Sequence, residues 1–437
     1  MRESMSWYKK LHWQIIVGLV LGLLWGLLSA SAGWNEFTSG TIRPFGTIFI
    51  NLLKLVAVPL VLVSLVVGVS SLNNMSRLTR MGGKTILIYL ATTLLAITIG
   101  LSVVNLVDPG SSLPESTRNS LMENYSAPVS GSVSDQESGS GSSILDFLVR
   151  VVPQNFFASA SENGNMLQIV FVAILLGLGI ISIPAQKSQT LIEVFDSLNE
   201  VIIKIVDLIM KLAPIGVFAL MASVIIDLAG DNIRDAITLL KALAWYSLTV
   251  IAGLVIHVLF VYSVLFKIFS KMKLSDFFRA IRPAVLLGFS TSSSLATLPV
   301  TMERVEKHLG VSEEVSSFVL PVGATINMDG TSLYQAVAAV FIAQAIGMEL
   351  TLTQQITIVF TATAASIGAA GVPGAGIIML VIVLQAVQVP VEGIALILGV
   401  DRILDMARTA VNVTGDAAVS VAVAHTEGKL GALHFDE

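Results

Sequence analysis

The residues best able to do chemistry lie in the stretch DRILDMARTAVNVTGD, near the carboxyl end of the chain. At about 100° per residue of α-helix, one face of this stretch carries five polar side chains within roughly 80°: Asp401, Asp405, Arg408, Asn412 and Asp416. An ionised residue at the middle of a bilayer costs about 2.5–3.5 kcal/mol. If the stretch is a membrane helix, this face must contact protein partners, water, ions or a charged solute, which is typical of a transport site.

Two of these residues predict a particular ligand chemistry. The guanidinium of Arg408 is always charged and matches a carboxylate through two parallel hydrogen bonds, while Asp405 is a natural partner for an ammonium group. Helical spacing also allows an internal ion pair between Arg408 and either Asp405 or Asp401. The two interpretations are compatible, since Asp401 can orient the guanidinium while it binds a ligand.

Composition indicates that the whole chain is an integral membrane protein. Of its 437 residues 54% are hydrophobic and 13% are charged, whereas soluble domains carry about 25% charged residues. Apolar runs long enough to span a bilayer recur along the chain, at about 12–31, 46–70, 85–107, 166–184, 200–226 and 236–266. Lipid tolerates only an internally satisfied backbone, so the sequence predicts an all-α polytopic bundle.

Several kinds of site are excluded by residue usage. The chain has no cysteine, which rules out disulfides, thiol catalysis and thiolate metal sites. The five histidines are scattered without metal-ligand spacing, so each is expected to be a loop, interface or packed residue: His12, His257, His308, His425 and His434. Nothing in the sequence indicates nucleic-acid binding.

The charge of the connections predicts the orientation in the membrane. Positive charge marks the cytoplasmic side, and it clusters before the first apolar run, near Arg77 and Arg80, and near Lys267 and Lys273. The first run is expected to be a retained helix and not a cleaved signal. Residues 108–143 are rich in Ser, Gly, Asp and Glu, which predicts a flexible extracellular loop.

Two short interruptions rich in small residues break the apolar pattern in the last third of the chain. They read GFSTSSSLATLP near Ser290 and ASIGAAGVPGAG near Ser366, and each precedes an Asn-centred polar motif, NMDGT from Asn327 and NVTGD from Asn412. Gly and Ser permit tight chain reversal and expose backbone groups. A pair of interrupted hydrophobic segments in corresponding positions indicates the binding site of a secondary transporter.

Four ordered motifs now carry a resemblance to a known family. SSSLATLPVT, LPVGATINMDGTSLYQ, SIGAAGVPGAGIIML and DRILDMARTAVNVTGD, with LLKLVAVPLVLVSLVVGV upstream, resemble the glutamate-transporter family of dicarboxylate/amino-acid:cation symporters over nearly the whole chain. The resemblance implies a homotrimer in the cell (inner) membrane, with eight transmembrane helices, two re-entrant helical hairpins, inverted repeats and an elevator movement. It also implies a division of the chain: 12–72 as scaffold helices 1–2, 84–107 as helix 3 of the transport domain, 108–143 as the extracellular loop, 144–230 as scaffold helices 4–5, and 236–425 as the rest of the transport domain.

The same resemblance implies roles for individual residues. Arg408 would hold the side-chain carboxylate of an acidic amino acid, Asp405 its ammonium group and Asn412 its α-carboxylate. Thr331 would add a hydroxyl, and backbone groups of both hairpin tips would close the pocket; these tip residues are Ser294, Val372 and Gly376. Family members that resemble C4-dicarboxylate carriers lack an acid at the position of Asp405.

Three sodium sites are likewise implied by the resemblance alone. The first uses Asp416 with carbonyls of Gly323, Asn327 and Asn412. The second uses Asp329 and Asn327 with Tyr89, Thr92 and Thr93, although these threonines would otherwise pass as helix residues bonded to their own backbone. The third uses backbone oxygens of Thr325, Ser366, Ile367 and Ala369.

The sequence departs from the family pattern at a few positions. Archaeal relatives often carry an arginine where this chain has Ser292, and animal relatives carry one where it has Met406; here Arg402 lies elsewhere, three residues before Asp405. Gln335 stands where proton- and potassium-coupled animal members carry a glutamate. Since an amide cannot shuttle a proton, we expect sodium coupling without proton or potassium counter-transport.

The leading hypothesis is therefore a sodium-coupled symporter of L-aspartate or L-glutamate that is not an enzyme. Alternatives on the same fold are a neutral amino-acid symporter, which Arg408 disfavours, a C4-dicarboxylate symporter, which Asp405 disfavours, and a proton-coupled glutamate symporter. From other classes, an ion channel would use the buried charges to line a pore. An intramembrane enzyme would need Asp329 and Asp416 as a carboxylate pair, but no other catalytic motif accompanies them.

Overall fold

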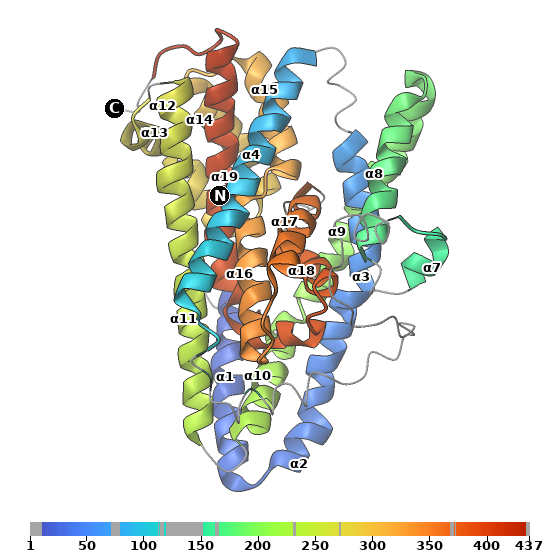
Figure 1. Cartoon of the computed structure of the whole chain (residues 1–437), viewed down its shortest axis with the longest axis vertical. Coiled ribbons are helices and arrows are strands. Elements are labelled where there is room, and N and C mark those ends of the chain that lie inside the picture. Colours follow the sequence, from blue (N-terminus) through green and yellow to red (C-terminus); the bar gives the residue numbers. More distant parts are fainter. Residues whose placement is uncertain are drawn as a thin grey trace, which may run out of the picture.

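The computed structural model describes residues 11–70, 79–111, 113, 118, 152–161, 166–229, 233–270, 272–367, 371 and 373–433. Helices make up nearly all of these residues (Figure 1). Within the same ranges there is no strand, and the one β-type contact is an isolated bridge between Val311 and Leu430. The all-α prediction is confirmed for the described part of the chain.

One group of helices is formed by the first and middle parts of the sequence. It contains α1 (Leu11–Ala32), α3 (Arg43–Ser70), α8 (Met166–Ser182), α9 (Ala185–Met210) and α10 (Ala213–Ala229). The short α2 (Asn35–Phe37) and the π-turn η2 (Thr38–Ile42) connect α1 to α3, and α7 (Phe156–Ser161) precedes α8. In Figure 1, α8 lies beside the upper part of α3 with α7 to the right, while α1 and α10 lie together in the lower part of the view.

A break divides the apolar run at 200–226. Helix α9 ends at Met210, α10 begins at Ala213, and the two helices are bent by 53°. Pro214 is the second residue of α10, where its missing N–H costs no intrahelical hydrogen bond and its fixed φ suits a helix start. The apolar run at 200–226 is thus divided between two helices next to Pro214, a residue that the sequence predicts to kink or break a helix.

The second group contains α4 and the helices after residue 233. Its members are α4 (Thr79–Val107), α11 (Ile233–His257), the π-turn η5 (Val258–Tyr262), α12 (Ser263–Phe269), α13 (Leu274–Thr291), α14 (Ser294–Lys307), α15 (Glu313–Ile326), α16 (Asp329–Ala345), α17 (Leu352–Ile367), α18 (Ala375–Ala386), the 3₁₀ turn η6 (Val391–Gly393) and α19 (Ile394–Thr426). The ranges 84–107 and 236–425, which the family resemblance implies for a transport domain, lie within this second group, and their role as one mobile domain stays a prediction. A continuous hydrophobic core joins the two groups of helices.

Two helical hairpins stand where the sequence has its small-residue interruptions. Helices α13 and α14 are joined at Ser292, which has a left-handed backbone (φ 54°), and Ser293, which caps α14 by accepting a hydrogen bond from Ala296 N–H. Helices α17 and α18 pack together, and the backbone before α18 turns at Gly374 with φ 81°. The first hairpin precedes α15 and α16, which are separated at Asn327 and Met328, and the second hairpin precedes the long α19. Each of these following segments is polar.

By length and composition, four described helical stretches can cross a membrane. They are Trp13–Ala32, Asn35–Ser70, Met81–Val107 and Thr238–Phe269, and the bent pair Ala185–Met210 with Ala213–Ile226 makes a fifth if it forms one span. Helix α19 has 33 residues, but its charged stripe marks it as a helix enclosed by protein. The predicted count of eight spans and the re-entrant nature of the hairpins remain predictions.

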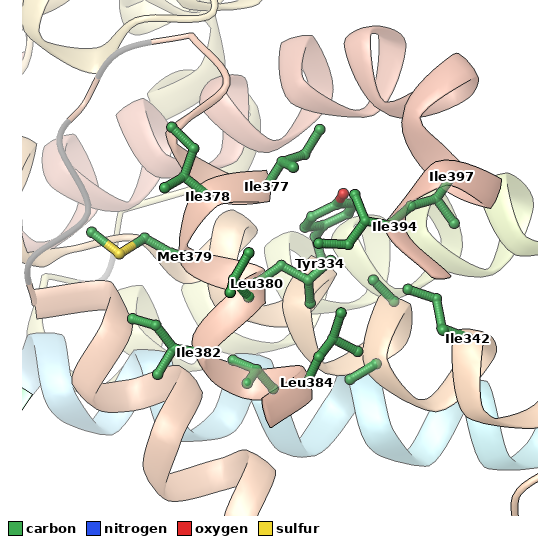
Figure 2. Close-up of a cluster of buried hydrophobic side chains, with 14 of the residues drawn as sticks. Tyr334, Ile342, Ile377, Ile378, Met379, Leu380, Ile382, Leu384, Ile394 and Ile397 are labelled. Atoms are coloured by element: carbon green, nitrogen blue, oxygen red, sulfur yellow. The ribbon is translucent and has the colours of Figure 1, made fainter. Parts of the chain in front are cut away.

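Helix α18 packs against α16 and α17 of the second group and against α3 and α8 of the first. All ten residues from Ala375 to Leu384 are buried. Figure 2 shows its isoleucines, leucines and Met379 packed against side chains of α16 and of the start of α19, with Tyr334 among them. This helix therefore forms part of the core, and it fixes the neighbouring ends of α16 and α19 on which the polar residues lie.

Candidate functional site

The guanidinium of Arg408 is held by two carboxylates of its own helix. Its Nη1 donates to Asp401 Oδ1 at 3.0 Å, and its Nη2 donates to Asp405 Oδ1 at 2.6 Å. Arg408 is 0% exposed, and both aspartates are also buried. The predicted internal ion pair is thus present with both partners, which compensates a charge that would otherwise be costly to bury.

Asp405 is shared between several donors. Its second oxygen, Oδ2, accepts a hydrogen bond from the backbone N–H of Gly374 at 3.2 Å, which ties α19 to the start of α18. The same oxygen lies 3.4 Å from Nη1 of Arg402, a second buried arginine. Asp405 therefore links two arginines with the second hairpin, so a change of its partner would affect all three.

An aromatic ring and a glycine complete the surroundings of Arg408. The guanidinium carbon lies 3.7 Å from the centre of the Tyr334 ring, a geometry that favours a cation–π interaction. A Cβ at Gly376 would lie 3.2 Å from the same guanidinium carbon, which leaves too little room for a larger residue. Tyr334 is surrounded by the apolar cluster of Figure 2, so the position of Arg408 is fixed by the hydrophobic core.

A narrow cavity lies beside Asp405, and its volume of about 10 Å³ is the space of about one water molecule. The structure brings five of the seven predicted substrate-binding residues to its wall: Ser294, Thr331, Gly376, Asp405 and Asn412. Arg408 lies behind Asp405 and is not part of the wall. Val372, the seventh predicted residue, lies outside the described residues. The remaining wall is formed by Ser292, Met328, Gly371, Ala375 and Thr409.

The polar groups of this wall are ordered by contacts between helices. Asn412 Oδ1 accepts a hydrogen bond from the backbone N–H of Gly330 at 2.8 Å, and its Nδ2 lies 3.2 Å from Thr331 Oγ1. The two hairpin tips meet directly, because Ser293 Oγ donates to the carbonyl of Gly371 at 2.7 Å. The cavity is therefore closed by the two tips on one side and by α16 and α19 on the other.

Asp416 lies one helical turn beyond Asn412 and is surrounded by neutral groups. Its Oδ1 accepts a hydrogen bond from Asn327 Nδ2 at 2.9 Å. A Cβ at Gly323 would lie 2.5 Å from the same oxygen, so glycine is required for α15 to approach this close. Asn327 ends α15, and its Oδ1 is buried without a hydrogen-bond partner among the described residues. Asp416 Oδ1 and the carbonyl oxygen of Asn412 thus both face the amide nitrogen of Asn327, at 2.9 and 3.5 Å, where the first sodium site is predicted.

Asp329 forms the centre of a second polar cluster. Its Oδ1 accepts a hydrogen bond from Thr93 at 2.7 Å and lies 3.3 Å from the hydroxyl of Thr92, which also lies 3.0 Å from the carbonyl of Tyr89 in its own helix. Its Oδ2 lies 3.2 Å from both His257 Nε2 and Tyr262 Oη. The structure therefore brings the predicted Thr92, Thr93 and Asp329 together and adds two partners from α11 and η5.

The other predicted ion ligands are less closely joined. Tyr89 is buried near Gly323, and its hydroxyl donates to the carbonyl of Val319 at 3.0 Å. Thr325 lies next to the end of α15, Ser366 and Ile367 end α17, and Ala369 lies outside the described residues. The hydroxyls of Thr325 and Ser366 donate to carbonyls of their own helices, so backbone oxygens of this third set stay a prediction.

Among the described residues, no group of three or more His, Asp or Glu side chains could hold a metal ion. Asp329 instead lies among the hydroxyl oxygens of Thr92, Thr93 and Tyr262 and the imidazole of His257, and Asp416 accepts a hydrogen bond from the amide of Asn327, which also faces the carbonyl oxygen of Asn412. Such an oxygen set suits a weakly bound monovalent cation in a transporter. It does not suit a tightly bound transition metal.

Sequence reasoning missed four residues of these clusters. Thr409 and Tyr334 lie three or four residues from a predicted site residue on the same helices, so helical spacing was a signal for both. His257 was interpreted as a packed or interfacial residue, and Tyr262 was not singled out. No spacing rule for α-helices points both of them at Asp329, for the reason given below.

The chain is similar to known membrane transporters along nearly its whole length. Residues 11–426 match the model of the Sodium:dicarboxylate symporter family. The proton/sodium-glutamate symport protein of Bacillus caldotenax is 35% identical over 96% of this chain and 95% of its own. The proton/glutamate-aspartate symporter of Escherichia coli (strain K12) is 36% identical over 96% and 93%. A C4-dicarboxylate transport protein of Bacillus subtilis (strain 168) is 35% identical over 99% and 96%.

Proposed function

Because the chain belongs to the sodium:dicarboxylate symporter family, and is thus an integral membrane symporter, we propose that it couples sodium to the uptake of acidic amino acids, L-aspartate or L-glutamate. The observation that carries this proposal is the buried pair of Arg408 and Asp405 beside a cavity closed by two hairpin tips. Arg408 is a receptor for carboxylate, and Asp405 is a receptor for ammonium. An acidic amino acid carries both groups.

Substrate binding would exchange partners within this pair. Asp405 now occupies the arm of the Arg408 guanidinium that a substrate side-chain carboxylate would take. An acidic amino acid replaces both lost partners at once, since its carboxylate takes Arg408 and its ammonium takes Asp405. Asp401 keeps its hydrogen bond to Nη1 and holds the guanidinium in place. The exchange gives Arg408 and Asp405 each a new charged partner, whereas the loss of a partner without replacement would cost several kcal/mol.

The rest of the cavity supports the same substrate. Asn412 Nδ2 and the hydroxyl of Thr331 face each other at 3.2 Å and would hold the α-carboxylate. The hydrogen bond from Gly374 N–H to Asp405 connects the second hairpin to the ammonium receptor. This hydrogen bond would form or break when the substrate binds to Asp405. We propose that the second hairpin opens and closes the site in response.

Two buried carboxylates support sodium as the coupling ion. Asp416 would bind one ion with carbonyl oxygens of Gly323, Asn327 and Asn412, and Asp329 would bind another with Asn327, Tyr89, Thr92 and Thr93. A third ion would use Thr325, Ser366, Ile367 and Ala369. Gln335 donates through Nε2 to the carbonyl of Gly376 at 3.3 Å, and its amide carries no transferable proton. We therefore propose no proton or potassium counter-transport.

We propose that the chain works as a homotrimer with an elevator movement. In this proposal α1, α3 and α8 to α10 form the scaffold, while α4 and α11 to α19 carry the substrate. The packing into two groups of helices supports this division. So does the location of the cavity, which is lined by residues of the second group alone.

A C4-dicarboxylate is the second candidate substrate. It is supported by Arg402, which lies 3.4 Å from Asp405 and would compensate this carboxylate if the substrate had no ammonium group. A relative that transports C4-dicarboxylates, at 35% identity, supports it too. The shorter contact of Asp405 with Arg408 and its position on the cavity wall favour the amino acid.

Transport by purified protein in liposomes tests substrate and ion together. We expect labelled aspartate or glutamate to accumulate when an inward sodium gradient is imposed, and unlabelled succinate to compete poorly. A gradient of protons without sodium should drive no uptake. Equal uptake with the proton gradient alone would overturn the sodium proposal, and stronger uptake of succinate than of aspartate would overturn the substrate proposal.

A further inference from the structure

His257 and Tyr262 meet at one carboxylate because of a π-turn. His257 is the last residue of α11, and the π-turn η5 spans Val258–Tyr262 before the chain continues as α12. Residues five apart in a regular α-helix point about 140° away from each other, at about 100° per residue. The i→i+5 pattern of a π-turn brings them to one side. Their rings stack edge to face at 5.1 Å, and both polar atoms lie 3.2 Å from Asp329 Oδ2.

The two oxygens of Asp329 have different partners. Oδ1 faces the hydroxyls of Thr92 and Thr93 on α4, while Oδ2 faces His257 and Tyr262. Asp329, His257 and Tyr262 are all 0% exposed. Hydrogen bonds from donors to a buried carboxylate are strong and fix its orientation. His257 of α11 and Tyr262 of η5 therefore hold one oxygen of Asp329, while its other oxygen faces hydroxyl groups of α4.

The hydrogen-bond pattern assigns a role to the imidazole. Nε2 must donate to reach a carboxylate oxygen, and Nδ1 is buried without a partner among the described residues. A proton on that second nitrogen would be an unsatisfied buried donor, which is costly. His257 thus acts as a hydrogen-bond donor, through Nε2, that holds one oxygen of Asp329.

We infer that His257 and Tyr262 are positioning residues for the cation at Asp329, an inference that rests on the proposed function of that carboxylate as a sodium ligand. When the ion binds, the hydroxyls of Thr92 and Thr93 must turn their oxygens toward it and give up their hydrogen bonds to Oδ1. The bonds to Oδ2 do not have to change. They keep the carboxylate aimed at the ion while its other partners reorient.

Tyr262 also contacts α19, the helix that lines the substrate cavity. Tyr262 Oη lies 3.4 Å from the carbonyl of Val411, the residue before Asn412. A Cβ at Gly415 would lie 2.6 Å from the same hydroxyl oxygen, so α19 approaches Tyr262 closely. The residue after Asp329, Gly330, donates its N–H to Asn412. A cation site that is fixed in this way is mechanically connected to the substrate site.

Sodium titrations of variants test the inference. Outer-sphere partners of metal ligands typically contribute about 10–100-fold in metal affinity. We expect His257→Ala to raise the half-saturating sodium concentration of aspartate uptake at least about tenfold, with a much smaller change of the substrate KM at saturating sodium. His257→Gln, whose amide N–H can donate to Asp329, should restore most of the sodium affinity. Tyr262→Phe should raise the sodium requirement less, since His257 remains.

Thr249→Val on α11 is the matched control. Its hydroxyl is buried like His257 but bonds to the carbonyl of Trp245 in its own helix, so its removal should leave the sodium titration unchanged. Sodium-dependent thermal stabilisation of purified protein gives a reading independent of transport. If His257→Ala does not fold, Tyr262→Phe decides, because the ring packing is kept.

Two failures can be told apart. If uptake by the unmodified protein does not depend on sodium, the proposed function is wrong. If uptake depends on sodium but folded His257→Ala and Tyr262→Phe both show the unmodified sodium titration, the positioning role is wrong. A loss in His257→Ala that His257→Gln does not restore would also overturn the assignment of a donor role.

Discussion

The two halves of the polar region differ in how they compensate their buried charges. Near the cavity, Arg402 and Arg408 face Asp401 and Asp405, so the cluster is compensated by its own ion pairs. Deeper in the bundle, Asp329 and Asp416 are contacted by hydroxyl, amide and imidazole groups. Among the described residues, neither of these two aspartates has a lysine or arginine as an ion-pair partner.

The charged cluster beside the cavity can exchange one ion-pair partner for another. Asp329 and Asp416 have no lysine or arginine partner among the described residues, so each can gain a cation without giving one up. A compensated cluster can release Asp405 to an incoming ammonium only if Arg408 receives a carboxylate in return. A buried carboxylate with neutral partners instead gains from any small cation that replaces its hydrogen bonds. The first arrangement suits the substrate of the proposed symport, and the second suits the coupling ion.

Removal of Arg408 is expected to have the largest effect, because it takes the main cation from the charged cluster beside the cavity. Arg408→Ala leaves Asp401 and Asp405 buried without their main cation, which we expect to destabilise the protein by about 3–5 kcal/mol and to abolish uptake of acidic substrates. Uptake of serine or alanine would remain in the fraction that folds. Thermal unfolding and transport of labelled amino acids in liposomes measure the two effects. Lys307→Ala, at an exposed position of α14, is the control, and unchanged aspartate affinity in Arg408→Ala would remove Arg408 from the site.

Asp416→Asn would test the part of the polar region whose two carboxylates, Asp329 and Asp416, have no lysine or arginine partner among the described residues. The amide oxygen can still accept the hydrogen bond from Asn327, so the fold should persist while the charge that attracts the ion is lost. We expect the half-saturating sodium concentration to rise about tenfold or more, as for the loss of a charge-assisted interaction of about 1.5–3 kcal/mol. Asp207→Asn, a half-exposed carboxylate on α9, should leave the sodium titration unchanged. Equal titrations for both variants would mean that Asp416 is not a ligand.

Asp405→Asn would test the charged cluster beside the cavity more specifically, because it removes only the proposed receptor for the substrate ammonium group. Arg408 would keep Asp401, and the amide oxygen could still accept from Gly374. We expect competition by succinate against aspartate to improve about tenfold, from the loss of one charged hydrogen bond of about 1.5–3 kcal/mol. Competition assays measure this ratio. Glu392→Gln, an exposed acid in η6, is the control, and an unchanged ratio in Asp405→Asn would contradict the assignment of Asp405 to the ammonium group.

The charged stripe of α19 could be predicted because helical periodicity alone brings its five residues to one face. The small-residue interruptions near Ser290 and Ser366 likewise predicted the ends of α13 and α17. Arg402 lies outside this stripe, but its distance of three residues before Asp405 is an ordinary spacing for an ion pair on a helix, and the structure has that pair at 3.4 Å.

The contact of His257 and Tyr262 with Asp329 was beyond sequence reasoning for a physical reason. Their spacing of five places them on different faces under the period of 3.6, and only the π-turn at Val258–Tyr262 brings them together. The left-handed backbone of Ser292 was hidden too, because serine rarely adopts it. Sites made of backbone oxygens, such as the set near Thr325 and Ser366, carry no side-chain signature at all.

Ser293→Ala is expected to have the smallest effect, and it acts on the closure of the compensated half. The hydroxyl donates to the carbonyl of Gly371 in the other hairpin tip and also caps α14, an interaction of about 0.5–2 kcal/mol. We expect the substrate KM to rise about fivefold, which corresponds to about 1 kcal/mol, with the sodium titration little changed. Ser290→Ala is the matched control, since that exposed hydroxyl bonds to Leu287 within α13. If both variants raised the substrate KM equally, the Ser293 hydroxyl would not contribute to closure, and the contact between the tips would depend on the N–H of Leu295, which also donates to the Gly371 carbonyl at 3.3 Å.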